Sequence, residues 1–311
     1  MQRNAKQRIV LVTQKTRLEN LVYRYNTIEQ VKFYLECRSG DFEEYRTEHE
    51  TYREALNSVV QSLERFGRVQ CLDREYISSF LFGEDDLVVA LGRDGLVANV
   101  LKYLERQKLI GVNSDPRRWD GYLVPFTVSE VPLIAQETLK NLRKTQIVTL
   151  AQATLNDGQS LCGVNDIFIG QKSHVSARYE LRFAQQKELQ CSSGIIVSTG
   201  LGKTGWLKSV LAGAGGVDRY FGLQGAPQLP QEFQRDSAYL YYAVREPYAS
   251  TSTGDTLVFG KVDAAHPLQI TSHMAENGVI FSDGVEEDYL QFNAGSVATV
   301  AVAEKQGHLV V

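Results

Sequence analysis

Long apolar runs are missing from this sequence of 311 residues, because none approaches the ~18 residues that a membrane-spanning helix needs. The chain also has no excess of charge of one sign. Its net charge of −4 offers no basic surface to nucleic acid or to an anionic membrane. The first residues lead directly into an apolar run and have no feature of a targeting signal. We therefore expect a soluble, cytoplasmic protein whose partners include neither nucleic acid nor membranes.

Cysteine and histidine are scarce, and neither type is grouped. The four cysteines, Cys37, Cys71, Cys162 and Cys191, form no Cys-x-x-Cys pair, and the histidines show no His-x-x-x-His spacing. A structural zinc site needs closely spaced ligands of these types. The sequence therefore predicts no metal-binding residues, and the scattered cysteines favour a reducing compartment.

The first third of the chain alternates short apolar runs with amphipathic segments. Strands are predicted at 8–13, 68–72, 86–91 and 109–113, and helices at 41–66 and 96–104. Strands that are separated by helices are typical of βαβ units, in which the strands run parallel. This pattern predicts a Rossmann-like α/β domain over residues 1–135.

After about residue 135 the character of the chain changes. Short strand-like runs follow one another, punctuated by glycine, Asn-Asp and Asp-Gly. Regularly spaced short strands with little helix are typical of an all-β, sandwich-like domain. One helix is predicted within it, at 205–213, after a glycine-rich turn. The fold class is therefore α/β plus all-β.

A charged turn interrupts the run VVALGRDGLVANV at 88–100. In an open α/β sheet, ligands bind beyond the carboxyl ends of the strands, where backbone N–H groups at helix N-termini favour anions. Gly92 and Gly95 would permit unusual backbone angles and the close approach of a phosphate, whose charge Arg93 could neutralise. Asp94 could accept a proton from a substrate hydroxyl. The alternative is a capped turn with Asp94 as N-cap and Arg93 in solvent.

The segment VSTGLGKTGW at 197–206 contains Gly-Lys-Thr after a strand, as a P-loop does. The P-loop pattern also requires a glycine at the position of Val197, so the motif fails. A phosphate-binding glycine turn of another type stays open, formed by Gly200, Gly202, Lys203 and Thr204. The alternative is a plain strand–turn–helix with a surface lysine.

Two further segments place polar residues beside strands. In GVNDIFIG, at 163–170, Asn165 and Asp166 precede an apolar run and could bind ribose hydroxyls or an amide, although such pairs are more often turns. The segment SDGVEEDYL at 282–290 carries four carboxylates. It predicts a hairpin turn with a solvated acidic tip rather than a metal site.

Taken together and in order, these segments resemble the NAD kinase family. That family has a Gly-Gly-Asp-Gly-Thr turn after an apolar strand, an Asn-Glu pair at the start of a later strand, and a Val-Ser-Thr-x-x-Gly-Ser-Thr-Ala-Tyr-like segment. Here VVALGRDGL, GVNDIFI and IIVSTGLGKTGW follow in the same order at similar spacing. The segments IGVNSDPRRWDGYL and FSDGVEEDYL resemble most the mitochondrial-type branch of the family, and this chain looks like a divergent bacterial relative.

The resemblance implies a nucleotide-binding domain at 1–135, a substrate-binding domain at 136–295 and a final segment at 296–311 that returns towards the first domain. It implies phosphorylation of NAD to NADP by ATP with Mg²⁺, in a homodimer or homotetramer. Asp94 matches the family's general base. The residues that match the ATP-binding and phosphate-binding positions are Gly92, Arg93, Gly95, Gly200, Gly202 and Lys203. The residues that match the substrate-binding positions are Asn165, Asp166, Thr204, Gly205 and Trp206.

Several residues depart from the family pattern. Arg93 replaces the second glycine and Leu96 the threonine of the signature turn, Asp166 is one methylene shorter than glutamate, and Lys203 replaces a serine. Two alternatives therefore stay open beside an NAD kinase: a kinase of the same fold that acts on a sugar or polyol, and a non-catalytic NAD(P)-binding protein. The phosphoryl donor could be ATP or polyphosphate.

Overall fold

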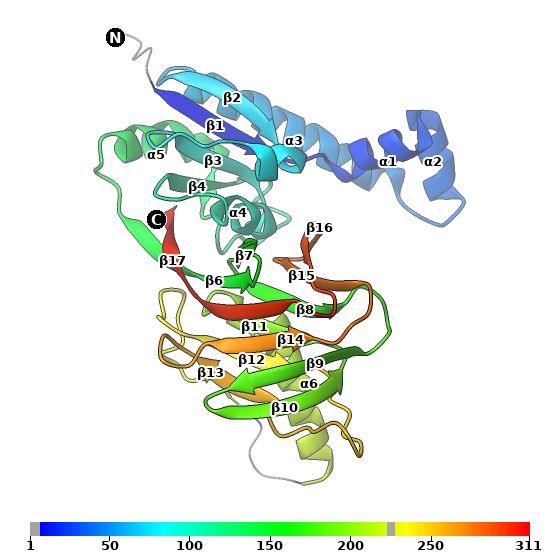
Figure 1. Ribbon diagram of the computed structural model, residues 1–311. Coiled ribbons are helices and arrows are strands. Elements are labelled where there is room, and N and C mark those ends of the chain that lie inside the picture. The colour runs from blue at the N-terminus through cyan, green and yellow to red at the C-terminus, as the bar shows by residue number, and fades with distance from the viewer. Residues whose placement is uncertain (1–6, 223–227) are drawn as a thin grey trace. The chain divides into compact units, whose positions relative to one another are not determined.

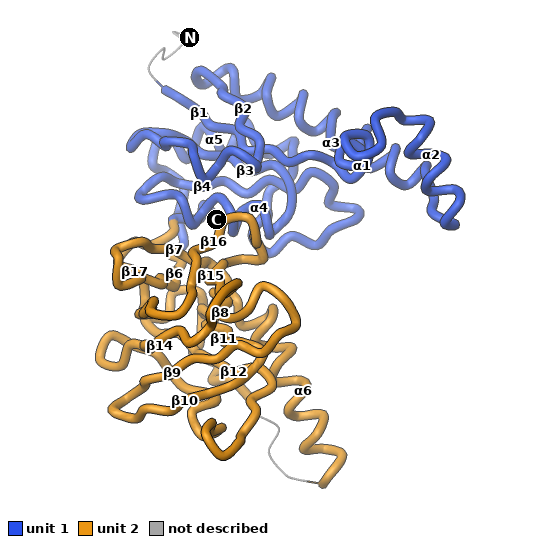
Figure 2. The backbone as a smooth tube through the Cα atoms, turned by 45° about the vertical axis from the view of Figure 1, so that its right-hand side comes forward, with its two compact units in different colours: residues 1–146, 308–311 blue, residues 147–307 orange. Residues whose placement is uncertain are grey.

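The computed structural model describes residues 7–222 and 228–311 (Figure 1). The chain divides into two compact units (Figure 2). The first runs to Gln146 and includes the last residues, His308–Val311, and the second comprises Ile147–Gly307. None of the described helices is long and apolar enough to cross a membrane.

The first unit is built on a parallel sheet in the order β2–β1–β3–β4. Its strands are β1 (Arg8–Thr13), β2 (Arg68–Asp73), β3 (Leu87–Gly92), β4 (Lys108–Asn113) and the short β5 (Phe126–Thr127). Every residue of β3 is buried, as expected for a central strand whose two faces are both covered. The predicted α/β domain with a parallel sheet is confirmed.

Helices α1 to α5 belong to the same unit. They are α1 (Arg17–Tyr25), α2 (Ile28–Glu36), α3 (Phe42–Leu63), α4 (Asp94–Leu101) and α5 (Val131–Leu139), with 3-10 turns at Arg74–Ser79 and Val128–Glu130. Apolar residues of α3 and α5 pack on the sheet in one core with Ile9, Leu11 and Val89. Helices α1 and α2, which the sequence analysis did not predict, extend beyond the sheet around a small core that they share with the start of α3 (Figure 1).

The second unit contains two antiparallel sheets. One contains β6 (Thr145–Leu155), β7 (Ser160–Gly163), β9 (Ala177–Phe183), β10 (Gln186–Ser192), β14 (Leu268–Ser272) and β17 (Val297–Val310). The other has the order β13–β12–β11–β8–β15–β16. Its strands are β8 (Asp166–Gln171), β11 (Ile195–Ser198), β12 (Leu240–Val244), β13 (Phe259–Val262), β15 (Gly278–Ser282) and β16 (Val285–Gln291).

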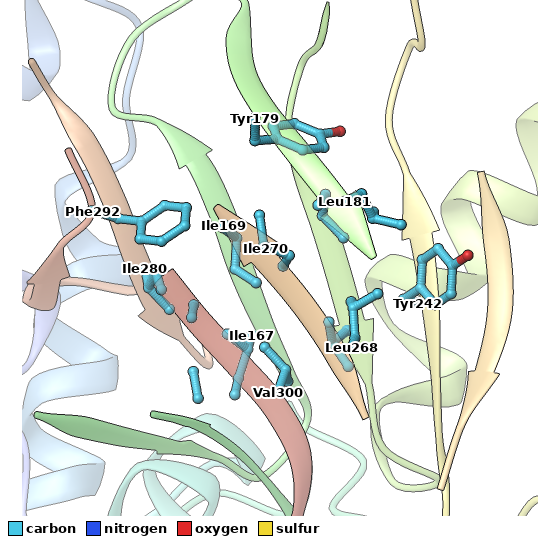
Figure 3. Packing of buried hydrophobic residues seen from close by; sticks show 14 of the residues in the cluster. Ile167, Ile169, Tyr179, Leu181, Tyr242, Leu268, Ile270, Ile280, Phe292 and Val300 are labelled. Atoms are coloured by element: carbon cyan, nitrogen blue, oxygen red, sulfur yellow. The ribbon is translucent and has the colours of Figure 1, made fainter. Parts of the chain in front are cut away.

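The two sheets share one apolar core, which Figure 3 shows from close by. Every second residue of a strand points into it, for example Ile167 and Ile169 of β8 and Leu268 and Ile270 of β14. This alternation is typical of a sheet with one face on the core, and the predicted sandwich-like domain is confirmed. Helix α6 (Trp206–Tyr220), after a 3-10 turn at Gly202–Thr204, extends seven residues beyond the predicted helix. The last residues of β17 pair with β4 of the first unit's sheet through His308 and Leu309.

Candidate functional site

Asp94 begins helix α4 directly after β3. Its N-cap is Arg93, whose backbone is extended and whose side chain makes no capping hydrogen bond, so the alternative in which Asp94 is the N-cap does not hold. As the first helical residue, the Asp94 carboxylate lies where the helix dipole favours negative charge. One of its oxygens accepts a hydrogen bond from the backbone N–H of Leu123 at 2.8 Å, and the other from Tyr122 at 3.2 Å. Asp94 therefore holds the loop after β4 against the start of α4.

The two glycines of this turn do not adopt the unusual backbone angles that the sequence analysis expected, because neither has a positive φ. Gly92 is buried, and a Cβ there would lie 3.1 Å from the Leu96 side chain. Gly95 is exposed, and a Cβ there would meet no atom within 4 Å. Gly95 therefore leaves the first turn of α4 accessible to a ligand, whereas Gly92 allows close packing against Leu96.

Arg93 is held by an aromatic ring and a carboxylate rather than extending freely into solvent. Its guanidinium lies 3.8 Å from the centre of the Trp119 ring and 3.7 Å from Glu48. Burial lowers the pKa of Arg93, while the Glu48 carboxylate opposes that effect. Arg93 therefore places a charged, half-buried guanidinium at the carboxyl end of β3. This is the edge of the sheet at which an anionic ligand would bind.

An ion-pair cluster surrounds Arg93. Glu48 of α3 contacts Arg17 at 2.6 Å and Arg118 at 3.1 Å, and Glu44 also pairs with both arginines. The three arginines outnumber the two glutamates, so the cluster is positive by one charge. The sequence analysis did not identify it, because its members come from α1, α3, the turn between β3 and α4, and the loop after β4.

A small cavity of about 20 Å³ lies beside the cluster, beyond the carboxyl ends of β1, β3 and β4. Its lining includes Gln14, Tyr52, Arg93, Asp115 and Trp119. The buried Oδ1 of Asp115 accepts no hydrogen bond from any residue that the structure describes. This edge is where open α/β sheets bind ligands.

The second group of predicted residues begins at the amino end of β8. Asp166 is 8% exposed and lies opposite Ser198 of β11. Burial, and to a lesser extent the charge of Asp283, raises the pKa of the Asp166 carboxyl to about 7. A carboxyl with such a pKa is partly protonated near neutral pH and can then donate as well as accept a hydrogen bond.

The contact of Asp283 with the start of β8 was not predicted by the sequence analysis. The expected hairpin is present between β15 and β16, but the prediction of a solvated acidic tip is wrong for Asp283. Its carboxylate accepts hydrogen bonds from the backbone N–H groups of Asn165, at 2.6 Å, and Val164, at 3.0 Å. Asp283 and Gly284 both have positive φ, as a type I′ hairpin turn requires. The Asp-Gly pair in the sequence predicted the hairpin turn, but it did not predict the hydrogen bonds that Asp283 accepts.

The glycine-rich turn after β11 is packed closely against its own unit. A Cβ on Gly200 would lie 1.7 Å from the backbone oxygen of Gln234, and one on Gly202 would lie 2.1 Å from that of Asn165. The ammonium group of Lys203 donates a hydrogen bond to the backbone oxygen of Phe233 at 2.6 Å. Both glycines are thus explained by close approach of the backbone, and Lys203 is not a free surface lysine.

The last predicted residues, Thr204, Gly205 and Trp206, end the 3-10 turn and begin α6. The Trp206 ring stacks on Phe168 of β8, with ring centres 5.6 Å apart and planes 11° from parallel. The guanidinium of Arg245 lies 5.2 Å from the Trp206 ring centre. Through Phe168 the start of α6 is fixed to the strand that Asp166 begins.

Comparisons with known proteins identify the fold. No family model and no curated relative matches the sequence. Two solved structures match nearly the whole chain at 14% identity. The crystal structure of an NAD kinase from Archaeoglobus fulgidus in complex with ATP has a TM-score of 0.57, over 98% of this chain and 94% of that one. The structure of yeast NADH kinase complexed with NADH has a TM-score of 0.59, over 99% of this chain and 84% of that one.

The two units therefore form the fold class that the NAD kinases define: an α/β unit with a parallel sheet and a unit of antiparallel sheets. The particular similarity is to kinases of NAD and NADH, and the predicted NAD kinase-like fold is confirmed.

Proposed function

We propose that this protein is an ATP-dependent kinase that phosphorylates the 2′-hydroxyl of the adenosine ribose of NAD. The observation that carries the proposal is the position of Asp94, on the first turn of α4 directly after β3, in a chain with an NAD kinase-like fold. A carboxylate at the carboxyl edge of a parallel sheet is placed where substrates bind. The structures to which the chain is similar hold ATP in one case and NADH in the other.

In the proposed reaction, the 2′-oxygen of the ribose attacks the γ-phosphorus of ATP. The bond from that phosphorus to the β,γ-bridging oxygen breaks and ADP leaves, while Asp94 accepts the proton of the hydroxyl. An ionised carboxylate has about four lone-pair positions. Two are used by the N–H groups of Tyr122 and Leu123, so Asp94 retains the capacity to accept a proton.

The donor phosphates would be bound by the charged and glycine-rich turns. Arg93 supplies a guanidinium at the edge of the positive cluster, and Gly95 leaves the start of α4 open. Lys203 could contribute a second cation after releasing the backbone oxygen of Phe233. The other residues of this proposed set are Gly92, Gly200 and Gly202.

The acceptor would be bound by Asn165 and Asp166, with Thr204, Gly205 and Trp206 nearby in the same unit. An amide and a partly protonated carboxyl offer donors and acceptors together, which suits the hydroxyl edge of a ribose. A site that binds a hydroxyl through hydrogen bonds strongly rejects analogues without it. This pair therefore favours a nucleotide as the acceptor.

Magnesium enters the proposal as part of the Mg·ATP substrate. No three His, Cys, Asp or Glu side chains of residues 7–222 and 228–311 gather to hold a metal ion. Mg²⁺ that is bound together with a nucleotide is usually held by the substrate phosphates, by water and by one or two carboxylates. The homodimer or homotetramer, which rests on the family resemblance, and the cytoplasmic location, which rests on the sequence alone, belong to the same proposal.

The direct test is to incubate the purified protein with ATP, Mg²⁺ and NAD or NADH and to assay NADP(H). Formation of NADP that the Asp94→Asn variant does not support would uphold the proposal. Binding of ATP without binding of NAD or NADH at millimolar concentration would instead favour the sugar or polyol kinase. Binding of NAD without any turnover would favour the non-catalytic protein.

A further inference from the structure

The tip of the β15–β16 hairpin holds the backbone that precedes β8. Asp283 accepts hydrogen bonds from the N–H groups of Asn165, at 2.6 Å, and Val164, at 3.0 and 3.1 Å to its two oxygens. Its own N–H donates to the backbone oxygen of Asp166 at 3.1 Å. Asp283 is 118 residues away from Asn165 in the sequence, so the contact exists only in the folded unit.

The opposite side of this turn is held by Thr199, which follows β11. The Thr199 hydroxyl donates to the backbone oxygen of Val164 at 2.6 Å, and its N–H donates to that of Asn165 at 2.9 Å. Each backbone group of Val164 and Asn165 thus has a partner within the unit. The Asn165 and Asp166 side chains consequently start from a fixed backbone, as a preorganised binding site requires.

The contact also places a negative charge beside Asp166. The neighbouring strands present uncharged groups at this end of β8, namely Ser198 of β11 and Ser282 of β15. Asp283, at the hairpin turn, is the charged group among the described residues whose field acts on the Asp166 carboxyl. Burial and this like charge both disfavour ionisation of Asp166.

We propose that Asp283 is a positioning residue of the acceptor site: it fixes the backbone of the Asn165–Asp166 turn and places a second carboxylate beside that of Asp166. The identity of the acceptor, a nucleotide ribose, rests on the proposed function. The fixed turn and the coupling between the carboxyl groups of Asp166 and Asp283 do not depend on the proposed function.

The charge can be separated from the hydrogen bonds by the substitution Asp283→Asn. An asparagine has nearly the same shape and no charge, and its one acceptor oxygen can replace Oδ1 of Asp283, which accepts from the N–H groups of both Asn165 and Val164. The matched control is Glu287→Gln, which removes one charge from an exposed residue of the same hairpin. A thermal melt of each variant reports whether the unit is still folded.

The test is a ¹³C NMR titration of the Asp166 carboxyl in the ligand-free proteins. In the wild type we expect a midpoint near pH 7. In Asp283→Asn we expect a lower midpoint that still lies above the ordinary value, because burial is the larger cause, and in Glu287→Gln an unchanged one. An ordinary midpoint in the wild type, or the same midpoint in Asp283→Asn, would overturn the proposal. If Asp283→Asn fails to fold, the wild-type titration still tests the proposal, because an ordinary midpoint there would contradict it.

Calorimetry with NAD then links the coupling to binding. We expect the pH at which NAD affinity changes to fall in Asp283→Asn together with the Asp166 midpoint, and to stay unchanged in Glu287→Gln. A shifted midpoint in a protein that binds no NAD would support the coupling and contradict the proposed acceptor. An unshifted pH dependence of NAD binding in Asp283→Asn would contradict the positioning role while the proposed function stood.

Discussion

The Oδ1 oxygen of Asp94 accepts a hydrogen bond of 2.8 Å from the backbone N–H of Leu123, which lies 29 residues further along the chain. The bond joins the first turn of α4 to the loop that follows β4. Asp94 therefore has a structural role in addition to the catalytic one that we propose for it. The two roles make different demands on the side chain, since a hydrogen bond needs an acceptor oxygen and proton transfer needs a basic carboxylate.

The substitution Asp94→Asn separates these roles. The asparagine oxygen can still accept from Leu123, but it cannot take up the proton of the hydroxyl. We expect kcat to fall by ~10²–10⁴, the usual contribution of a general base, while ATP and NAD binding largely survive. Steady-state kinetics and calorimetry measure the two effects. The control is Asp120→Asn, which alters an exposed carboxylate in the loop before Leu123; wild-type turnover in Asp94→Asn would remove the catalytic role.

Removal of the proposed phosphate-binding charges should weaken ATP binding. A hydrogen bond to a charged group contributes roughly 1.5–3 kcal/mol, so we expect Arg93→Ala and Lys203→Ala each to raise the ATP KM about tenfold or more. Arg117→Ala is the control, because that side chain is 88% exposed. If neither variant changes the ATP KM, then Arg93 serves only its contacts with Trp119 and Glu48, and Lys203 only its bond to Phe233.

The sequence allowed the two units to be predicted because their patterns are local. The run at 8–13 is apolar and β-branched, and it forms β1 with the predicted bounds. The apolar run that contains Ile167 and Ile169 was predicted as a strand, and it forms β8 with both residues in the core. Helices α1 and α2 were missed because most of their residues are polar or exposed, and their small core is shared only with residues at the start of α3.

The candidate site was predictable only in part. The turn with Asp94 follows an apolar run and the pair Asn165–Asp166 precedes one, so both were visible in the sequence. The partners of these residues were not, because they come from distant positions: Leu123 for Asp94, and Asp283 for Asn165. Hydrophobic periodicity carries no information about which loops meet at the end of a strand, so the environment of each carboxylate had to come from the structure.

Asp166 should distinguish the acceptor from the donor. If the acceptor is NAD, Asp166→Ala removes a hydrogen-bonding group from its ribose and leaves the donor phosphates untouched. We therefore expect NAD affinity to fall more than ATP affinity, as measured by calorimetry at pH 7. By the same reasoning, 2′-deoxy-NAD should not be phosphorylated. An equal loss of both affinities would point to general damage to the unit rather than to a contact with the acceptor.

The raised pKa of Asp166 should also make stability depend on pH. The folded-state pKa is about 7 and the ordinary value is 3.8, so between these values the unfolded chain releases a proton that the folded protein keeps. The contribution of this group to stability is therefore fully present below about pH 4, decreases as the pH rises, and is lost above about pH 7. At high pH, Asp166→Asn removes the free-energy cost of burying an ionised carboxylate. We expect it to raise the free energy of unfolding at pH 8, relative to its effect at pH 5, by on the order of 1–3 kcal/mol.

Urea denaturation of the wild type and Asp166→Asn at pH 5 and pH 8 measures this difference directly. The difference in stability between the wild type and Asp166→Asn at each pH does not contain the titration of the other groups, which is the same in both proteins. Glu287→Gln, which removes an exposed charge, should show no such difference between the two pH values. If Asp166→Asn changes stability equally at pH 5 and pH 8, then Asp166 is ionised in the folded protein at both. If the predicted gain appears together with the loss of NAD binding, the wild type retains at this position a group that costs stability and serves binding.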